Sequence, residues 1–141
     1  MSSPDVWDDV SARVLAAAAA LSPSIPVAMP NEEFERPDPP NYWIGLDTIA
    51  HTTTPIELTG GMWQESGTVL VHVMLPVFTG IRAGLVIRKA ISNAFRNVAD
   101  APAGLIYRDG QMLDSLGIPS DDGIYRPLSL AVNYIWQDMP T

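Results

Sequence analysis

Apolar residues near the start of the chain recur at the three- and four-residue intervals of one helix face: Val6, Val10, Val14, Ala17, Ala18 and Leu21. Such spacing predicts an amphipathic helix. Ser3 can cap this helix, and Pro4 suits its first position. Pro23 ends it, because proline cannot continue a helix. We therefore expect one helix within residues 1–22.

Residues 23–42 form a proline-rich segment with six prolines. Ile25 to Met29 could form a short strand at a sheet edge, since prolines do not fit a central strand. The stretch from Asn31 to Pro40 is predicted to be an extended loop that follows the surface. Ile25 and Phe34 offer apolar anchors for it.

Alternating apolar and polar positions predict strands over much of the remaining chain. One strand runs from Trp43 to Ala50 and is broken by the polar residues 51–55. Another runs from Met62 to Leu75, with Gly67 as an expected bulge or bend. Residues 105–107 form a short strand. A long half-buried strand follows, with an apolar face formed by Ile124, Leu128, Leu130, Val132, Tyr134 and Trp136.

A second helix is predicted from Ile81 to Val98, with Thr79 as its cap. Its apolar stripe is formed by Gly84, Ile87, Ile91, Ala94, Phe95 and Val98. Consecutive strands with one helix between them favour an α+β fold over a doubly wound parallel sheet. The expected fold is a single α+β domain, with a mostly antiparallel or mixed sheet of about four to five strands packed by two helices.

The chain is acidic, with eight basic and sixteen acidic side chains and a net charge of −8 among 141 residues. Residues 1–65 carry ten acids and two bases, so the whole excess lies there. A protein that grips nucleic-acid phosphates has the opposite balance. No apolar run approaches the roughly 20 residues of a membrane span, and the first residues show no secretory signal.

Few residues indicate chemistry. The chain has no cysteine, which excludes disulfides, thiolate nucleophiles and most structural zinc sites. No phosphate-binding loop or nucleophile elbow is present, and we expect no cofactor and no metal site. His72 alternates with Leu70 and Met74 and is expected to be partly buried. A small enzyme or ligand-binding domain that uses His72 and nearby carboxylates stays open as the alternative to a structural protein.

Two features suggest contact surfaces. The second helix carries four bases and no acid from residue 82 to 96, namely Arg82, Arg88, Lys89 and Arg96. These bases either form a solvated face, dock on an acidic surface, or contact nucleic acid. Trp63 stands beside a glycine pair and is expected to be exposed to a partner. The polar stretch from Thr52 to Ser66 is expected to be mobile and to become ordered on assembly.

The order of these features resembles that of tail terminator proteins from long-tailed bacteriophages. The resemblance covers roughly residues 25–138. It is carried by Asn31 and Phe34 before the proline-rich loop, Trp43-Ile44 opening a strand, Gly67 and a valine-rich strand ending in Pro76, Gly80 and Ala83 opening a helix, and Gly123 before the closing strand. One departure is Ile124-Tyr125, where such proteins are expected to have a tryptophan.

The resemblance implies a structural virion protein and no enzyme. Such proteins form a hexameric ring on the head-proximal end of the tail tube. The ring ends polymerisation of the tail tube protein and presents a surface to the head completion or connector protein. DNA passes through its hole without tight binding. The protein would be assembled in the host cytoplasm, reside in the virion and have no membrane contact.

On this interpretation the whole chain, residues 1–141, is one tail-terminator-like domain. It consists of the first helix, the proline-rich segment, and a unit over residues 43–138 with the sheet and the second helix. The candidates for the subunit interface are Arg82, Arg88, Lys89, Arg96 and Trp63. The candidates for lining the hole are two acids of the first half, Glu57 and Glu65.

Overall fold

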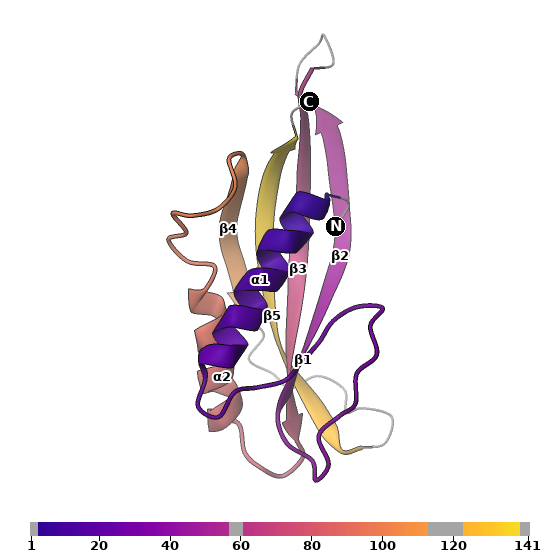
Figure 1. Ribbon diagram of the computed structural model, residues 1–141, viewed down its shortest axis with the longest axis vertical. Coiled ribbons are helices and arrows are strands. Elements are labelled where there is room, and N and C mark those ends of the chain that lie inside the picture. The colour runs from indigo at the N-terminus through magenta and orange to yellow at the C-terminus, as the bar shows by residue number, and fades with distance from the viewer. Residues whose placement is uncertain (1–2, 57–60, 113–122, 139–141) are drawn as a thin grey trace.

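The computed structural model describes residues 3–56, 61–112 and 123–138. Two helices and five strands follow one another along the chain (Figure 1): α1 Pro4–Ala20, β1 Val27–Ala28, β2 Trp43–Pro55, β3 Trp63–Pro76, α2 Arg82–Asn93, β4 Leu105–Met112 and β5 Tyr125–Asp138. The strands form one sheet in the order β1-β2-β3-β5-β4. The prediction of an α+β fold with two helices and about four to five strands is confirmed.

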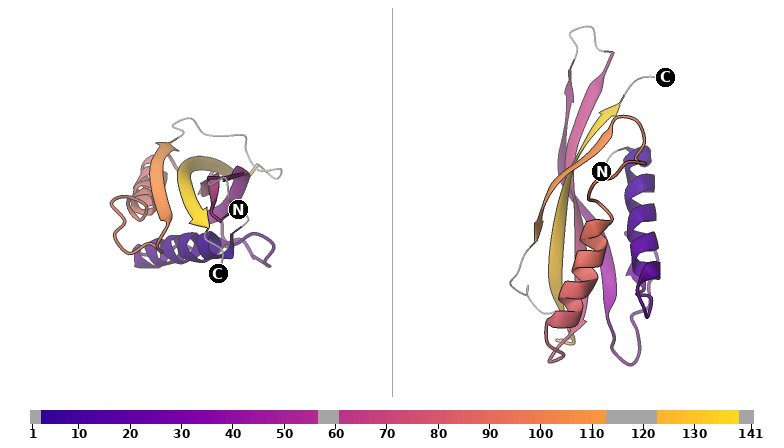
Figure 2. Two further views of the ribbon diagram at one scale, coloured as in Figure 1. Left: turned by 90° about the horizontal axis from the view of Figure 1, so that it is seen from above. Right: turned by 90° about the vertical axis from the view of Figure 1, so that its left-hand side faces the viewer.

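The sheet is mixed because β1 pairs parallel with β2, whereas the other neighbours pair antiparallel. β1 lies at an edge, as Pro26 and Pro30 on either side of it predicted. The long strands β2, β3 and β5 follow from that edge, and β4 closes the other edge. Both helices lie on the same face of the sheet, as the two views of Figure 2 show. The opposite face carries no helix of the described chain.

The core lies between the helices and the sheet. On β3 and β5 every second side chain is buried there, in step with the alternation of the sequence. The helices contribute the residues that recur at helical spacing. The buried members from α1 and from α2 with its following turn are Val6, Val10, Val14, Ala18, Ile87, Ile91 and Phe95. They meet Val69, Val71, Val73, Leu75, Leu128, Leu130, Val132, Tyr134 and Trp136 of the sheet.

The polar stretch from Thr52 to Ser66 is largely strand, so the prediction of a mobile loop there was wrong. β2 continues to Pro55, and its last residues pair with the start of β3, from Thr52 opposite Ser66 to Pro55 opposite Trp63. Threonine is β-branched and favours strands, which explains why the threonine run does not break β2. Residues 57–60 lie outside the described residues.

Gly67 does not form the expected bulge. Its own strand stays in continuous register with β5, where it lies opposite Tyr134. The irregularity is in β2 between Ile49 and Thr52, across from Gly67. The glycine instead provides space, because a Cβ at this position would lie 2.6 Å from the Tyr134 hydroxyl oxygen.

α2 is shorter than predicted and begins without the expected cap. It starts at Arg82, and the Thr79 hydroxyl donates a hydrogen bond of 2.6 Å to the carbonyl of Pro76 instead of capping the helix. After Asn93 the backbone continues in three-residue turns, with Phe95 N–H donating to the Ser92 carbonyl. Ser3 occupies the N-cap of α1 but makes no side-chain hydrogen bond there.

Candidate interaction surfaces

The inner side of α2 explains its position on the sheet. Gly84 brings the helix close to β3, because a Cβ there would lie 2.7 Å from Leu75 Cδ2. Arg88, four residues later, points the same way and is only 4% exposed. One of its guanidinium nitrogens donates to the Ser129 carbonyl of β5 at 3.4 Å. Arg88 is therefore part of the subunit interior and is not available as the interface residue that its charge suggested.

The outer face of α2 combines cations with apolar side chains. Arg82, Lys89 and Arg96 are exposed, as predicted for bases on a free helix face. Within the described residues none of the three forms an ion pair, and Arg96 only donates to the Asn93 side chain at 3.4 Å. Three large apolar side chains are exposed beside them. We call this set the α2 outer face: Ile81, Arg82, Leu85, Val86, Lys89 and Arg96.

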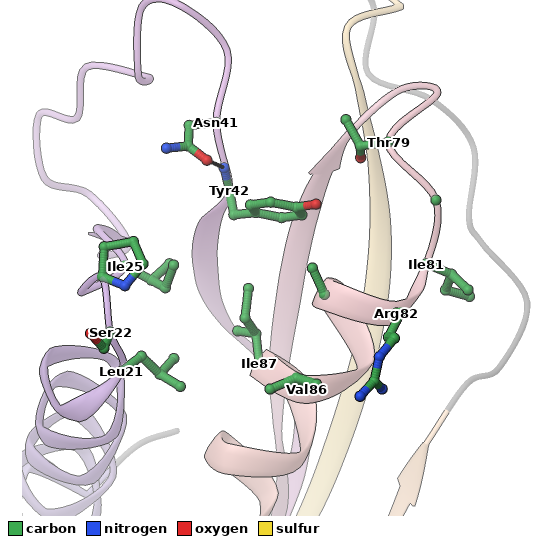
Figure 3. A pocket seen from close by; sticks show the side chains of 13 residues that line it. Leu21, Ser22, Ile25, Asn41, Tyr42, Thr79, Ile81, Arg82, Val86 and Ile87 are labelled. Atoms are coloured by element: carbon green, nitrogen blue, oxygen red, sulfur yellow. Dashed lines mark hydrogen bonds between the residues drawn. The ribbon is translucent and has the colours of Figure 1, made fainter.

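A groove runs from the α2 outer face towards the end of α1. It has a volume of about 810 Å³. Figure 3 shows Leu21 and Ile25 on one side of it, Val86 and Ile87 on the other, and Tyr42 between them. None of the described residues that line it is a carboxylate or a histidine. A surface of this composition suits an apolar partner segment.

Phe78 is the most exposed aromatic side chain of the described residues and was missed by the sequence analysis. It lies in the turn between β3 and α2 with a positive φ of 64°, and it is fully exposed. Non-glycine residues adopt this backbone region infrequently, so the turn specifically presents the ring to solvent. The signal in the sequence was an aromatic residue inside a Pro-Val-Phe-Thr-Gly turn.

The segment between β1 and β2 is rich in exposed negative charge. We call residues 31–41 the acidic loop, with four exposed acids, Glu32, Glu33, Glu35 and Asp38. Its hydrophobic member, Phe34, packs on Trp43 with ring centroids 5.1 Å apart. The guanidinium of Arg36 lies 5.4 Å from the centre of the Tyr125 ring. These contacts hold the loop on the surface, as the apolar anchor predicted.

A polar cluster joins α1 to the chain before β4. Arg13 donates to Asp9 at 2.8 Å and to Asp100 at 2.9 Å, and its guanidinium lies over the Tyr107 ring. The Tyr107 hydroxyl donates to the same Asp9 carboxylate. The hydrogen bond from Arg13 lowers the pKa of the Asp100 carboxyl from its ordinary value. No local sequence pattern predicts this cluster, since its members are up to 98 residues apart in the chain.

The two candidates for lining a hole have different outcomes. Glu57 lies outside the described residues. Glu65 is 3% exposed and accepts a hydrogen bond of 2.9 Å from the Tyr134 hydroxyl. The pKa of the Tyr134 hydroxyl is raised, mainly by its burial and further by the hydrogen bond to the Glu65 carboxylate. Glu65 thus belongs to the interior of the subunit, where its carboxylate faces a tyrosine and not a lumen.

Trp63 is 42% exposed, as the sequence suggested. It opens β3 beside Asp138 of β5, whereas α2 follows the other end of β3. The structure therefore does not bring Trp63 together with the bases of α2. Trp63 and the bases of α2 therefore belong to two separate surfaces.

His72 lies on the helix-free face of the sheet and is partly buried, as predicted. Its Nδ1 is 2.7 Å from the Ser129 hydroxyl oxygen. Burial lowers its pKa from the ordinary 6.5, and the charge of Asp47 opposes this shift. Among the described residues, no three side chains of the metal-ligating types gather to hold an ion. The hydrogen bond to Ser129 gives His72 a structural partner.

We expect His72 to make stability depend on pH below neutrality. Between its lowered folded-state pKa and 6.5, the unfolded chain binds more protons than the folded subunit. The free energy of unfolding should therefore fall as the pH drops through 6.5. Urea denaturation at a series of pH values should show that His72→Gln flattens this decrease. An unchanged decrease in His72→Gln would contradict the assignment.

The comparisons with known proteins agree with a domain whose exposed side chains suit protein contacts. The family model described as phage tail terminator protein matches residues 5–134. The chain belongs to the phage tail terminator family. Membership gives it a structural role in a phage tail and confirms the resemblance seen in the sequence. No curated protein matches the chain in sequence.

The fold of this chain is also found in solved structures. One of them superposes with a TM-score of 0.62 at 20% sequence identity, over 100% of this chain and 99% of the other. At this identity the likeness concerns the fold alone. Within the described residues, no helix is both long and apolar enough to cross a membrane.

Proposed function

We propose that this terminator protein forms a ring on the head-proximal end of the phage tail tube, where it ends polymerisation of the tube protein. The family match over residues 5–134 is the observation that carries the proposal. On its far side the ring contacts the head completion or connector protein. By analogy with the family we propose six subunits, assembled in the host cytoplasm and retained in the virion.

The exposed surfaces support an assembly role. Phe78, Ile81, Leu85 and Val86 are large apolar side chains left exposed on one end of a small subunit. Large exposed apolar side chains grouped within a short stretch of chain suit a protein contact site. The apolar groove beside them is a second surface that suits a protein neighbour.

The oligomeric state is the first test of this proposal. Purified protein should elute as a multiple of its 15.3 kDa mass, and negative-stain images should show closed rings. Native mass spectrometry counts the subunits, for which we propose six. A monomer at every concentration, also in the presence of tube protein, would overturn the proposed ring.

DNA should pass through the ring without being held. Each phosphate contact by a lysine or arginine adds salt-dependent affinity, and a ring multiplies such contacts. The chain instead carries a net charge of −8, all of it on residues 1–65. We propose that acids of this half, with Glu57 as the remaining candidate, line the hole.

A fluorescence anisotropy titration at low salt should show no saturable binding of duplex DNA up to about 10 μM protein. Tight binding would mean that the bases face the hole.

A further inference from the structure

We infer that the acidic loop of one subunit docks on the α2 outer face of the next subunit. This inference rests on the proposed ring and names the two surfaces that close it. A ring of identical subunits has heterologous interfaces, so each subunit must present two different, complementary surfaces. The acidic loop and the α2 outer face meet this requirement in position, charge and chemistry.

The acidic loop projects away from α2, although Asn41 at the end of the loop lines the same groove as the α2 outer face. In Figure 1, α2 lies to the left of the sheet, and the loop between β1 and β2 extends to the right. The view from above in Figure 2 shows the same separation. The two elements also lie towards the same end of the long axis (Figure 1). A side-by-side neighbour would therefore bring its loop to the level of α2.

Charge complementarity favours this contact. The α2 outer face presents Arg82, Lys89 and Arg96, and α2 contains no acid. The acidic loop presents four exposed acids, and its one base, Arg36, lies over the Tyr125 ring of its own subunit. Facing patches of opposite charge steer association and fix register, while like charges at the same interface would disfavour wrong pairings.

Apolar surface and rigidity add to the match. Pro30, Pro39 and Pro40 in and around the loop are exposed and can cover the apolar members of the α2 outer face. The loop is also ordered before docking. Phe34 packs on Trp43, and the backbone N–H of Asn41 donates to the Tyr125 hydroxyl at 3.3 Å. Preorganisation of this kind reduces the entropy that association costs.

The chemistry points to a second copy as the occupant of the α2 outer face. The same chain supplies both the cationic helix and an exposed, anchored acidic loop, so the two surfaces are present in equal number. A duplex of DNA, which would also attract three cations, is disfavoured by the net charge of −8 on each subunit. The contact should therefore weaken as salt is added, because exposed charges are screened within about 8 Å at physiological ionic strength.

Two charge-reversed variants test the contact. Variant one carries Arg82→Glu and Lys89→Glu, so that both its surfaces are acidic. Variant two carries Glu33→Lys and Glu35→Lys, which makes its loop basic beside a basic helix. All four positions are exposed, so both variants should fold, and circular dichroism with urea denaturation verifies this. Asp138→Lys, an exposed position opposite Trp63 and outside both surfaces, is the control for charge reversal elsewhere on the subunit.

The expected result is that each variant alone needs at least about 10-fold more protein than the wild type to form rings. The equimolar mixture should recover rings, because the acidic loop of variant one meets the basic helix of variant two, and the reverse. Subunits then alternate, so only rings with an even number of subunits can close, which native mass spectrometry detects from the two masses.

The outcomes separate this inference from the proposed function. Wild-type rings with unchanged ring formation by both variants would overturn the docking inference and leave the proposed ring standing. Wild-type rings with impaired variants that do not recover on mixing would show that the loop is not the partner of the α2 outer face. A wild type that forms no ring, alone or with tube protein, would overturn the proposed function and the inference together.

Discussion

Arg88→Glu should destabilise the subunit by more than about 3 kcal/mol, whereas Lys89→Glu should leave its stability within about 0.5 kcal/mol. The two residues are adjacent and carry the same charge, but Arg88 is 4% exposed and Lys89 is exposed. A glutamate at position 88 would bury a carboxylate against the Ser129 carbonyl, which now accepts a hydrogen bond from Arg88. Burying an uncompensated charge is among the most costly single substitutions.

Urea denaturation of the two variants under identical conditions measures this difference. Arg88→Met provides the control, since it keeps an unbranched apolar stem while removing the charge. It should be less destabilising than Arg88→Glu, because a neutral side chain leaves no buried charge. Equal stability of the glutamate variants at positions 88 and 89 would contradict the burial of Arg88 between α2 and β5.

Gly67→Ala should lower the free energy of unfolding by about 1–3 kcal/mol, the cost of overpacking a filled site. A Cβ at Gly67 would lie 2.6 Å from the Tyr134 hydroxyl oxygen and 2.8 Å from Cζ. The tyrosine cannot move away without loss, because it is 2% exposed and donates to the buried Glu65 carboxylate. The same methyl group thus strains the ring and its hydrogen bond.

Gly45→Ala is the matched control, since Gly45 lies in the neighbouring strand β2. Its added Cβ would meet Trp43 Cζ3 at 3.6 Å, an ordinary van der Waals contact. Alanine also reduces the entropy of the unfolded chain, so this variant should be neutral or more stable by up to about 1 kcal/mol. If thermal or urea denaturation shows Gly67→Ala to be as stable as Gly45→Ala, Tyr134 does not occupy the space over Gly67.

The elements with a clear hydrophobic period were predictable from the sequence. Val6, Val10 and Val14 mark the buried side of α1, and the alternating apolar residues of β5 mark its buried face. Their position depends on local spacing, which a single sequence displays directly. The order of the strands in the sheet and the face that both helices cover depend on contacts between distant segments, and these the pattern does not specify.

The errors at charged positions have a physical cause. Arg88 lies on the inner side of α2 with Gly84 and Ile91, at helical spacing. The spacing therefore indicated that Arg88 is buried, but its charge led to the prediction that it is exposed. Glu65 lies two residues before Gly67 and four before Val69, on the same side of β3. Strand parity would have placed it towards the core. In both cases a distant partner, Ser129 or Tyr134, makes burial of the polar group tolerable.

The surfaces proposed for assembly could be predicted only in part. The sequence revealed the basic second helix and the acidic first half, because charge counts need no structure. It did not reveal that the acidic loop projects away from α2, nor that Phe78 is fully exposed in its turn. Both facts follow from the path of the chain around the sheet.

The central claim is that this protein ends growth of the tail tube, and a polymerisation assay tests it most directly. Tube protein is allowed to assemble with and without the terminator protein, and tube lengths and ends are measured by electron microscopy. The account predicts that added protein arrests elongation and that a ring is seen at one end of each arrested tube. Tubes that grow to the same lengths, with bare ends, in the presence of excess folded protein would contradict it.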